Sequence, residues 1–209
     1  MYIFDKILQH MTGIITGDII NSRKKIPESW MVKLKETLSL FGETPKDWEI
    51  FRGDSFQLEI LPKDALKACI LIKSAIKQFK TLDVRLAIGL GDKTYAAKTI
   101  TESNGSAFVN SGECFEGLKK QTLALKSNFQ EFDITINTML DLANLTMNSW
   151  SVTSSTIINT TLNNPNLNQK ELAQLLGKSQ SNISEGLKRG GYDEISKLLH
   201  YYNTKVKNL

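Results

Sequence analysis

The sequence predicts an α+β body built on an antiparallel sheet, followed by a small all-α domain. Two observations lead to this prediction. Up to residue 91, apolar segments typical of buried strands alternate with segments whose apolar residues recur at helical spacing. The segment "NNPN" at 163–166 then interrupts the chain, and the pattern after it is helical. We therefore divide the chain into a body at 1–128, a helical connector at 129–164 and the all-α domain at 165–209.

The composition narrows the class of protein. Hydrophobic residues make up 41% of the 209 residues and charged residues 23%, as in ordinary folded domains. No apolar run approaches the roughly 20 residues that span a bilayer. The first ten residues, "MYIFDKILQH", lack a long apolar core, so we expect no signal peptide, no membrane contact and a cytoplasmic location. Two cysteines and two histidines are too few for a disulfide scaffold, a zinc site or a histidine-based triad.

The body is predicted to run strand, helix, strand, strand, helix, strand. The strands are rich in β-branched residues and the helices carry apolar residues at a helical period. The segments in order are 11–20, 27–41, 48–51, 55–60, 65–80 and 83–91. This order makes a four-stranded antiparallel sheet with helices on one face, in which the first strand lies beside the third.

The rest of the body and the connector are less regular. A loop is predicted to enter a helix near Phe108, and "LALKS" at 123–127 is compatible with an outer strand. The segment 129–163 is predicted to be helical. Its expected packing residues are Met139, Leu142, Leu145 and Trp150.

Two carboxylates are the first candidates for chemistry. If the first strand lies beside the third, the exit of the first strand and the hairpin turn share one edge of the sheet, which brings Asp18 near Asp54. Each follows a glycine, Gly17 or Gly53. Paired carboxylates suit Mg²⁺ or Mn²⁺, hard cations that share their oxygen ligands with substrate phosphates. The alternatives are a helix N-cap for Asp18 and a plain turn residue for Asp54.

The neighbouring charged residues have simpler interpretations. Arg85 is expected to be structural and paired with a carboxylate such as Asp83 or Glu59. Lys24 and Lys25 are expected to be a solvated pair, with phosphate binding as the alternative.

The segment "NQKELAQLLGKSQSNISEGLKR" at 168–189 resembles the helix-turn-helix of bacterial transcription regulators. Ala173 is the small residue needed where two helices cross, Gly177 serves the turn, and Ile183 packs the second helix on the first. Ser179 is the expected N-cap of the second helix. The alternative is an ordinary helical hairpin whose polar face is solvated.

The resemblance implies that the second helix enters the major groove of double-stranded DNA. Residues 165–209 carry seven basic and four acidic side chains, which agrees with a nucleic-acid partner. A homodimer is also expected, because helix-turn-helix proteins usually bind as dimers. The residues predicted to contact DNA are Lys178, Ser179, Gln180, Ser181, Ser184, Lys188 and Arg189.

The body resembles class III nucleotide cyclases over roughly residues 11–120. "IITGDIINSR" is similar to their metal-binding first strand, and "FRGDSFQLEI" to their hairpin and to the GGDEF hairpin of diguanylate cyclases. "RLAIGLGD" and "GSAFVNSGECFEGLK" resemble the strand and helix that follow. A ferredoxin-like, nucleotide cyclase-like sheet followed by a helix-turn-helix resembles the SatD family, with "ITGDIINSRK" and "WEIFRGDSFQ" carrying the match.

The chain departs from the cyclase pattern. The base-reading Lys of cyclases falls near Ile50, and the Arg that stabilises their transition state falls near Cys114, while Asn110 matches their Asn. Ser55 stands where GGDEF proteins carry Glu. The residues expected to bind nucleotide or phosphate are Gly17, Arg23, Arg52, Gly53 and Asn110.

Three functions remain open at this stage. The first is a cytoplasmic DNA-binding regulator whose body binds a divalent metal and a nucleotide or phosphate ligand. The alternative is a Mg²⁺-dependent nucleotidyl cyclase or nucleotidyltransferase. The third is a body that serves only as a dimerisation platform.

Overall fold

The computed structural model describes residues 11–209 and has an α+β fold. The first ten residues, on which the expected lack of a signal peptide rests, lie outside the described residues. The strands are β1 (Met11–Ile20), β2 (Trp48–Phe51), β3 (Ser55–Ile60), β4 (Asp83–Asp92) and β5 (Leu123–Lys126). The helices are α2 (Pro27–Leu38), α3 (Ala65–Ile76), α4 (Ser106–Gly117), α5 (Gln130–Met147), α6 (Val152–Asn163), α7 (Gln169–Leu176), α8 (Gln180–Gly190) and α9 (Tyr192–Val206). Three short 3₁₀ helices are η1 (Ser22–Lys24), η2 (Pro62–Asp64) and η3 (Ile100–Glu102).

The sheet has the order β2-β3-β1-β4-β5. The first four strands pair antiparallel, and β1 lies beside β3, as predicted. The outer strand expected at 123–127 is β5, which pairs parallel to β4 and makes the sheet mixed and five-stranded. A strand that follows its neighbour through a crossover helix pairs in parallel, and α4 supplies that crossover.

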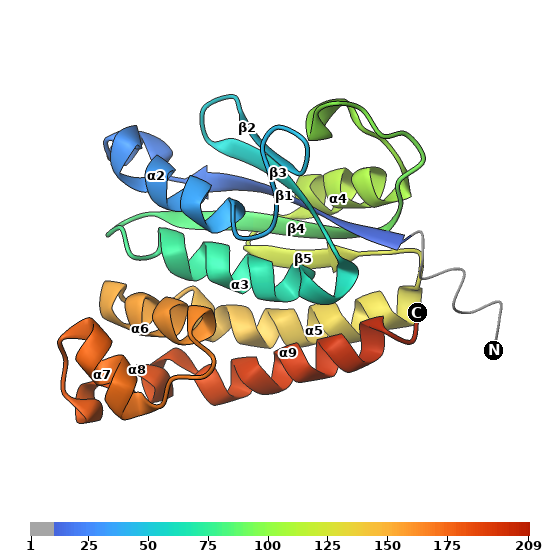
Figure 1. Cartoon of the computed structure of the whole chain (residues 1–209). Coiled ribbons are helices and arrows are strands. Elements are labelled where there is room, and N and C mark those ends of the chain that lie inside the picture. The colour runs from blue at the N-terminus through green and yellow to red at the C-terminus, as the bar shows by residue number, and fades with distance from the viewer. Residues whose placement is uncertain (1–10) are drawn as a thin grey trace.

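Helices cover both faces of the sheet rather than one (Figure 1). Alternate β1 residues such as Ile15 and Ile19 pack in the cluster formed with α2 and α3, and Ile14 packs with Ala107 of α4 on the other face. Gly89 permits the close approach of α4, because a Cβ there would lie 2.2 Å from the Ala107 carbonyl oxygen. The prediction of helices on one face was wrong. It considered only the elements up to residue 91, whereas α4 follows them and packs on the second face of the sheet.

The phase of α5 also differs from the prediction. Trp150 is buried and Met139 is packed against the core, but Leu142 and Leu145 are 67% and 74% exposed. The inward stripe of α5 is Ile136, Leu140, Asn144 and Met147. These positions recur at helical spacing on one side, so the two leucines project from the other side.

The C-terminal helix belongs to the same packing unit as the body. In Figure 1, α9 runs beside α5 beneath the sheet layer. Tyr202 of α9 is fully buried, and its hydroxyl donates to the carbonyl of Pro62 at 2.7 Å. The predicted boundary between 164 and 165 stays a prediction, but α9 shares the main hydrophobic cluster with α3 and α5. Among the described residues, no helix combines the length and the apolar character needed to cross a membrane.

Candidate functional sites: the α8 face and the sheet rim

The corner between α7 and α8 is built by local sequence. Asn168 and Glu171 form a capping box at the start of α7. Gly177 ends α7 at φ 60°, a left-handed conformation in which glycine is favoured. The Ser179 side chain accepts from the backbone N–H of Asn182 at 3.2 Å, so Ser179 is the N-cap of α8 as predicted.

The inner side of the corner is apolar. Ala173 and Ile183 are buried, and both pack in one cluster with Ile157 of α6. Leu172 and Leu187 belong to the same cluster. The spacing of apolar residues at 168–189 therefore identified the buried side of these two helices correctly.

Two glycines that the sequence argument missed lie where α8 crosses α6. A Cβ at Gly186 would lie 2.3 Å from Cδ1 of Ile157, and a Cβ at Gly190 would lie 2.3 Å from Cδ1 of Ile158. The indole N–H of Trp150 also donates to the carbonyl of Gly190 at 2.9 Å. The signal for this contact was the spacing of glycines four residues apart in "GLKRG", since small residues at that spacing let helices approach closely.

The outer side of α8 carries the residues predicted to contact DNA. All seven are exposed, and we call this surface the α8 face: Lys178, Ser179, Gln180, Ser181, Ser184, Lys188 and Arg189. Glu185 lies 3.9 Å from Arg189, and both side chains are well exposed, so this ion pair is weak and leaves the arginine available. The α8 face thus combines three cations with short polar side chains.

The second candidate lies where β1 ends, the β2–β3 hairpin turns and β4 begins. We call this edge the sheet rim, comprising residues 18–25, 52–55 and 81–85. Asp18 lies opposite Ser55 in the β1–β3 register, and the N–H of Ile19 donates to the carbonyl of Asp54 at 3.1 Å. The long-range pairing of β1 with β3 therefore brings Gly17-Asp18 and Gly53-Asp54 to one edge, as predicted.

Asp18 is paired with Arg85, which lies opposite it in the β1–β4 register. Nε of Arg85 donates to Oδ1 of Asp18 at 2.9 Å, and a terminal nitrogen donates to Oδ2. The hydrogen bond to Asp18 raises the pKa of Arg85. The guanidinium also lies 5.3 Å from the ring centroid of Phe115 on α4, at cation–π distance.

The predicted partners of Arg85 were wrong. Asp83 accepts instead from Lys73 at 2.8 Å and from Lys77 at 3.1 Å, and both lysines come from α3. Glu59 pairs with Lys93. The reason is cross-strand register: Asp18 of β1 lies directly opposite Arg85 of β4, and directly opposed side chains are the ones that interact across a sheet.

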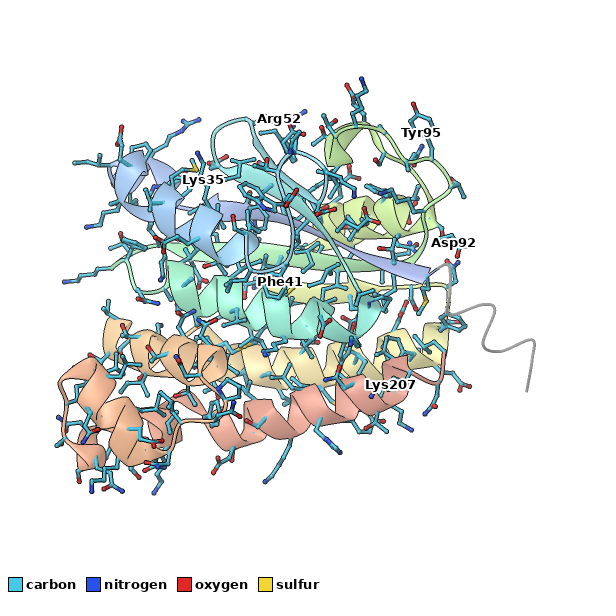
Figure 2. The ribbon with its side chains drawn as sticks, viewed as in Figure 1. Lys35, Phe41, Arg52, Asp92, Tyr95 and Lys207 are labelled. Atoms are coloured by element: carbon cyan, nitrogen blue, oxygen red, sulfur yellow. The ribbon has the colours of Figure 1, made fainter. Side chains whose placement is uncertain are left out.

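Asp54 sits in the hairpin turn, with Oδ2 accepting from the hydroxyl of Ser22 at 2.6 Å. The turn also holds Arg52 at φ 53° and Gly53 at φ 90°. Arg52 is exposed at this turn and is labelled in Figure 2. Asp92, also labelled there, lies at the far end of β4 from Arg85, opposite Met11 of β1. The helix N-cap alternative for Asp18 is wrong, because β1 continues through Ile20.

Several residues of the sheet rim have the left-handed backbone conformation, with positive φ. Within residues 11–209, the positive-φ residues other than glycine are Asn21, Arg52 and Thr81. The Asn21 side chain donates to the carbonyl of Thr81 at 3.0 Å, which ties the exit of β1 to the entry of β4. Such conformations are uncommon for a β-branched residue such as threonine, and they concentrate at functional sites.

The remaining predicted phosphate-binding residues divide between this edge and elsewhere. Arg23 lies on η1 and is exposed, as are Lys24 and Lys25, so these cations stand on the sheet rim. Asn110 is buried on α4, and its amide donates to the carbonyl of Leu90 at 2.8 Å. Leu90 is five residues along β4 from Arg85, about 17 Å away, so the structure does not bring Asn110 to the sheet rim.

The donor set of the sheet rim bears on a metal site. Among the described residues, no group of three or more histidine, cysteine, aspartate or glutamate side chains is placed to hold a metal ion. Asp18 and Asp54 supply the oxygen ligands that Mg²⁺ and Mn²⁺ prefer, but Arg85 covers both oxygens of Asp18. A cation could use both oxygens of Asp18 only if the pair with Arg85 were broken.

Comparison with known proteins adds one finding. The family model described as the SatD family matches residues 10–195, most of the chain. No curated protein matches the chain.

Proposed function

This chain belongs to the SatD family, and we propose that it is a cytoplasmic DNA-binding protein of the transcription-regulator type. Its sheet rim binds a divalent cation together with a nucleotide or another phosphate-bearing ligand. Two features of the fold support the finer description. The antiparallel order β2-β3-β1-β4 supports a ferredoxin-like, cyclase-like body, and the capped corner of α7 and α8 on α6 supports a helix-turn-helix.

The observation that carries the DNA-binding proposal is the two-sided character of α8. Its inner residues, including Ile183 and Gly186, are buried against α6, while all seven residues of the α8 face are exposed. Gln180 can bond adenine bidentately in the major groove, and the cations Lys178, Lys188 and Arg189 can hold phosphates. Ser179 caps the helix N-terminus, the end that recognition helices direct at base edges.

The test is a fluorescence-polarisation titration of the full chain with double-stranded DNA at several salt concentrations. We expect Lys188→Ala to weaken binding about equally across sequences and to reduce the salt slope by about one. Lys119→Ala is the matched control, because it removes the same charge from an exposed site between α4 and β5. No duplex affinity at low salt would exclude this function.

The ligand half of the proposal rests on the sheet rim. Its two carboxylates stand among the exposed cations Arg23 and Arg52, a mixture that suits a phosphate group with its counter-cation. When bound, the cation would neutralise phosphate charge. Ligand occupancy would bias DNA binding to the extent that the ligand binds two conformations unequally.

A thermal-shift screen of nucleotides with Mg²⁺ or Mn²⁺ tests this half separately. A specific ligand at a hundred times its Kd should stabilise the chain by about 2.7 kcal/mol, and Asp54→Asn should remove the shift. Stabilisation that survives Asp54→Asn would move the ligand to another site.

The enzymatic alternative, a nucleotidyl cyclase or nucleotidyltransferase, is favoured by one observation only, the meeting of Asp18 and Asp54 at one edge. Asn110 holds α4 to β4 by its bond to Leu90 and is remote from that edge, so it is not available to a reaction there. Pyrophosphate release from a nucleoside triphosphate, abolished by Asp54→Ala, would promote this alternative over ligand sensing.

A further inference from the structure

A groove of about 1280 Å³ runs between α5 and α9, the two helices that lie side by side in Figure 1. Its floor is apolar and includes Met139, Ala143, Ile195, Leu198 and Tyr201. The sheet rim and the predicted DNA contacts do not explain this groove, although Lys188 and Arg189 lie at one end of it. Exposed apolar surface gathered in a groove with a polar border is typical of an interaction site.

The helix that forms one wall of the groove also carries unpartnered leucines. Leu142 lines the groove and Leu145 lies one turn further along α5, with exposed fractions of 67% and 74%. Ile134 is 60% exposed on the same helix. One helix therefore supplies both a wall of the groove and apolar side chains that project from it.

The charges beside these leucines and around the groove are opposite. Lys197 and Lys205 of α9, with Lys188 and Arg189 at the end of α8, line the groove and outnumber its one acidic residue, Glu194. The outer side of α5 instead exposes Asp141, beside Leu142, and Glu131 near the start of the helix. The projecting face of α5 is thus apolar and acidic, whereas the α5–α9 groove is apolar and basic.

We propose that the α5–α9 groove is a homodimer interface, in which each copy inserts the Leu142–Leu145 face of α5 into the groove of its partner. The two surfaces are complementary in polarity and charge, and both lie on every copy. This is the arrangement that a two-fold axis satisfies, since each patch then meets its complement twice. The proposal concerns the free protein and does not depend on DNA binding.

The test is sedimentation equilibrium of the full chain without DNA over a wide range of concentration. We expect a reversible dimer, and we expect Leu145→Lys to weaken it about a hundredfold or more, because the ammonium would be buried in a groove that already carries Lys197 and Lys205. Val32→Lys is the matched control, since Val32 is 56% exposed on α2, away from the groove. It should leave the dimer unchanged. Circular dichroism checks that each variant is folded.

Several outcomes would overturn the interface. A wild-type chain that is monomeric at every concentration would do so, and so would a dimer that Leu145→Lys leaves intact. A monomer that binds a hydrophobic dye in competition with a fatty acid would assign the groove to a small amphiphile instead. Because no DNA is present, failure of the dimer does not by itself exclude duplex binding, which is measured separately.

Discussion

The α7–α8 corner and the sheet rim assemble their candidate residues by different means. At the corner, the caps Asn168 and Ser179, the left-handed Gly177 and the buried Ile183 lie within 16 positions of one another in the sequence. At the sheet rim, Asp18 is paired with Arg85, 67 positions away. Local pattern decides which side of α8 is exposed, whereas strand register decides what neutralises Asp18. The corner should therefore tolerate local changes better than the sheet.

The largest expected effect is that of Gly89→Ala. A Cβ there would lie 2.2 Å from the Ala107 carbonyl oxygen and the Ser111 nitrogen, both backbone atoms that cannot move independently of α4. We expect a loss of about 3 kcal/mol or more in the free energy of unfolding, measured by urea denaturation.

The matched change at the corner is Gly186→Ala. Its new Cβ would meet the side chain of Ile157, most closely the terminal Cδ1 at 2.3 Å, and no backbone atom is among its nearest neighbours. Alanine also favours a helix by about 1 kcal/mol over glycine. The net change should stay within about 1 kcal/mol. Equal losses from the two substitutions would break the proposed contrast between a rigid sheet layer and an adaptable corner.

The next prediction uses thiol reactivity to distinguish the sheet layer from the α7–α8 corner. Cys69 and Cys114 lie on α3 and α4, and the sequence has no cysteine after Cys114. Burial, and secondarily the nearby Asp133, raises the pKa of Cys114 to about 12. At pH 8 the native thiol should therefore alkylate at least about a hundredfold more slowly than an unfolded one.

The raised pKa of Cys114 also predicts that the free energy of unfolding depends on pH. Because the folded pKa of Cys114 is raised above the ordinary value of 9.0, its contribution to stability is fully present below pH 9 and is lost as the pH rises through about 12. The alkylation rate of Cys114 is measured by iodoacetamide labelling followed by mass spectrometry.

Gly89→Ala should accelerate this labelling, and Gly186→Ala should not. Fast labelling of the wild-type chain would show that the sheet layer opens readily.

A smaller effect is expected from Arg85→Gln. The substitution removes the cation that covers both oxygens of Asp18, so Mn²⁺ should bind the sheet rim about fivefold more tightly, the equivalent of about 1 kcal/mol for a partly exposed ion pair. Isothermal titration calorimetry measures the affinity. Lys93→Gln, which breaks the Lys93–Glu59 pair instead, is the control. Equal affinities of wild type and Arg85→Gln would remove Arg85 as a competitor of the metal.

These contrasts explain how much the sequence could predict. The alternation of strands and helices, and the topology that sets Asp18 near Asp54, follow from short-range periodicity and from the usual way such units pack. The partner of Arg85 could not be predicted, because it depends on the β1–β4 register rather than on spacing along one strand. Leu142 was assigned to the core because apolar character does not indicate which side of a helix faces inward when both sides carry apolar residues.

The smallest effect should come from Ser179→Ala, and it tests whether the corner is built by local sequence. The Ser179 side chain accepts a hydrogen bond from the backbone N–H of Asn182. Loss of an N-cap costs about 1 kcal/mol of stability. Ser179→Asn keeps a capping side chain and should restore the stability measured by urea denaturation. Because the cap acts only on the first turn of α8, Cys114 labelling on α4 should be unchanged in both variants. If Ser179→Ala accelerated that labelling, the corner and the sheet would open as one unit, and the separation between local and long-range assembly would fail.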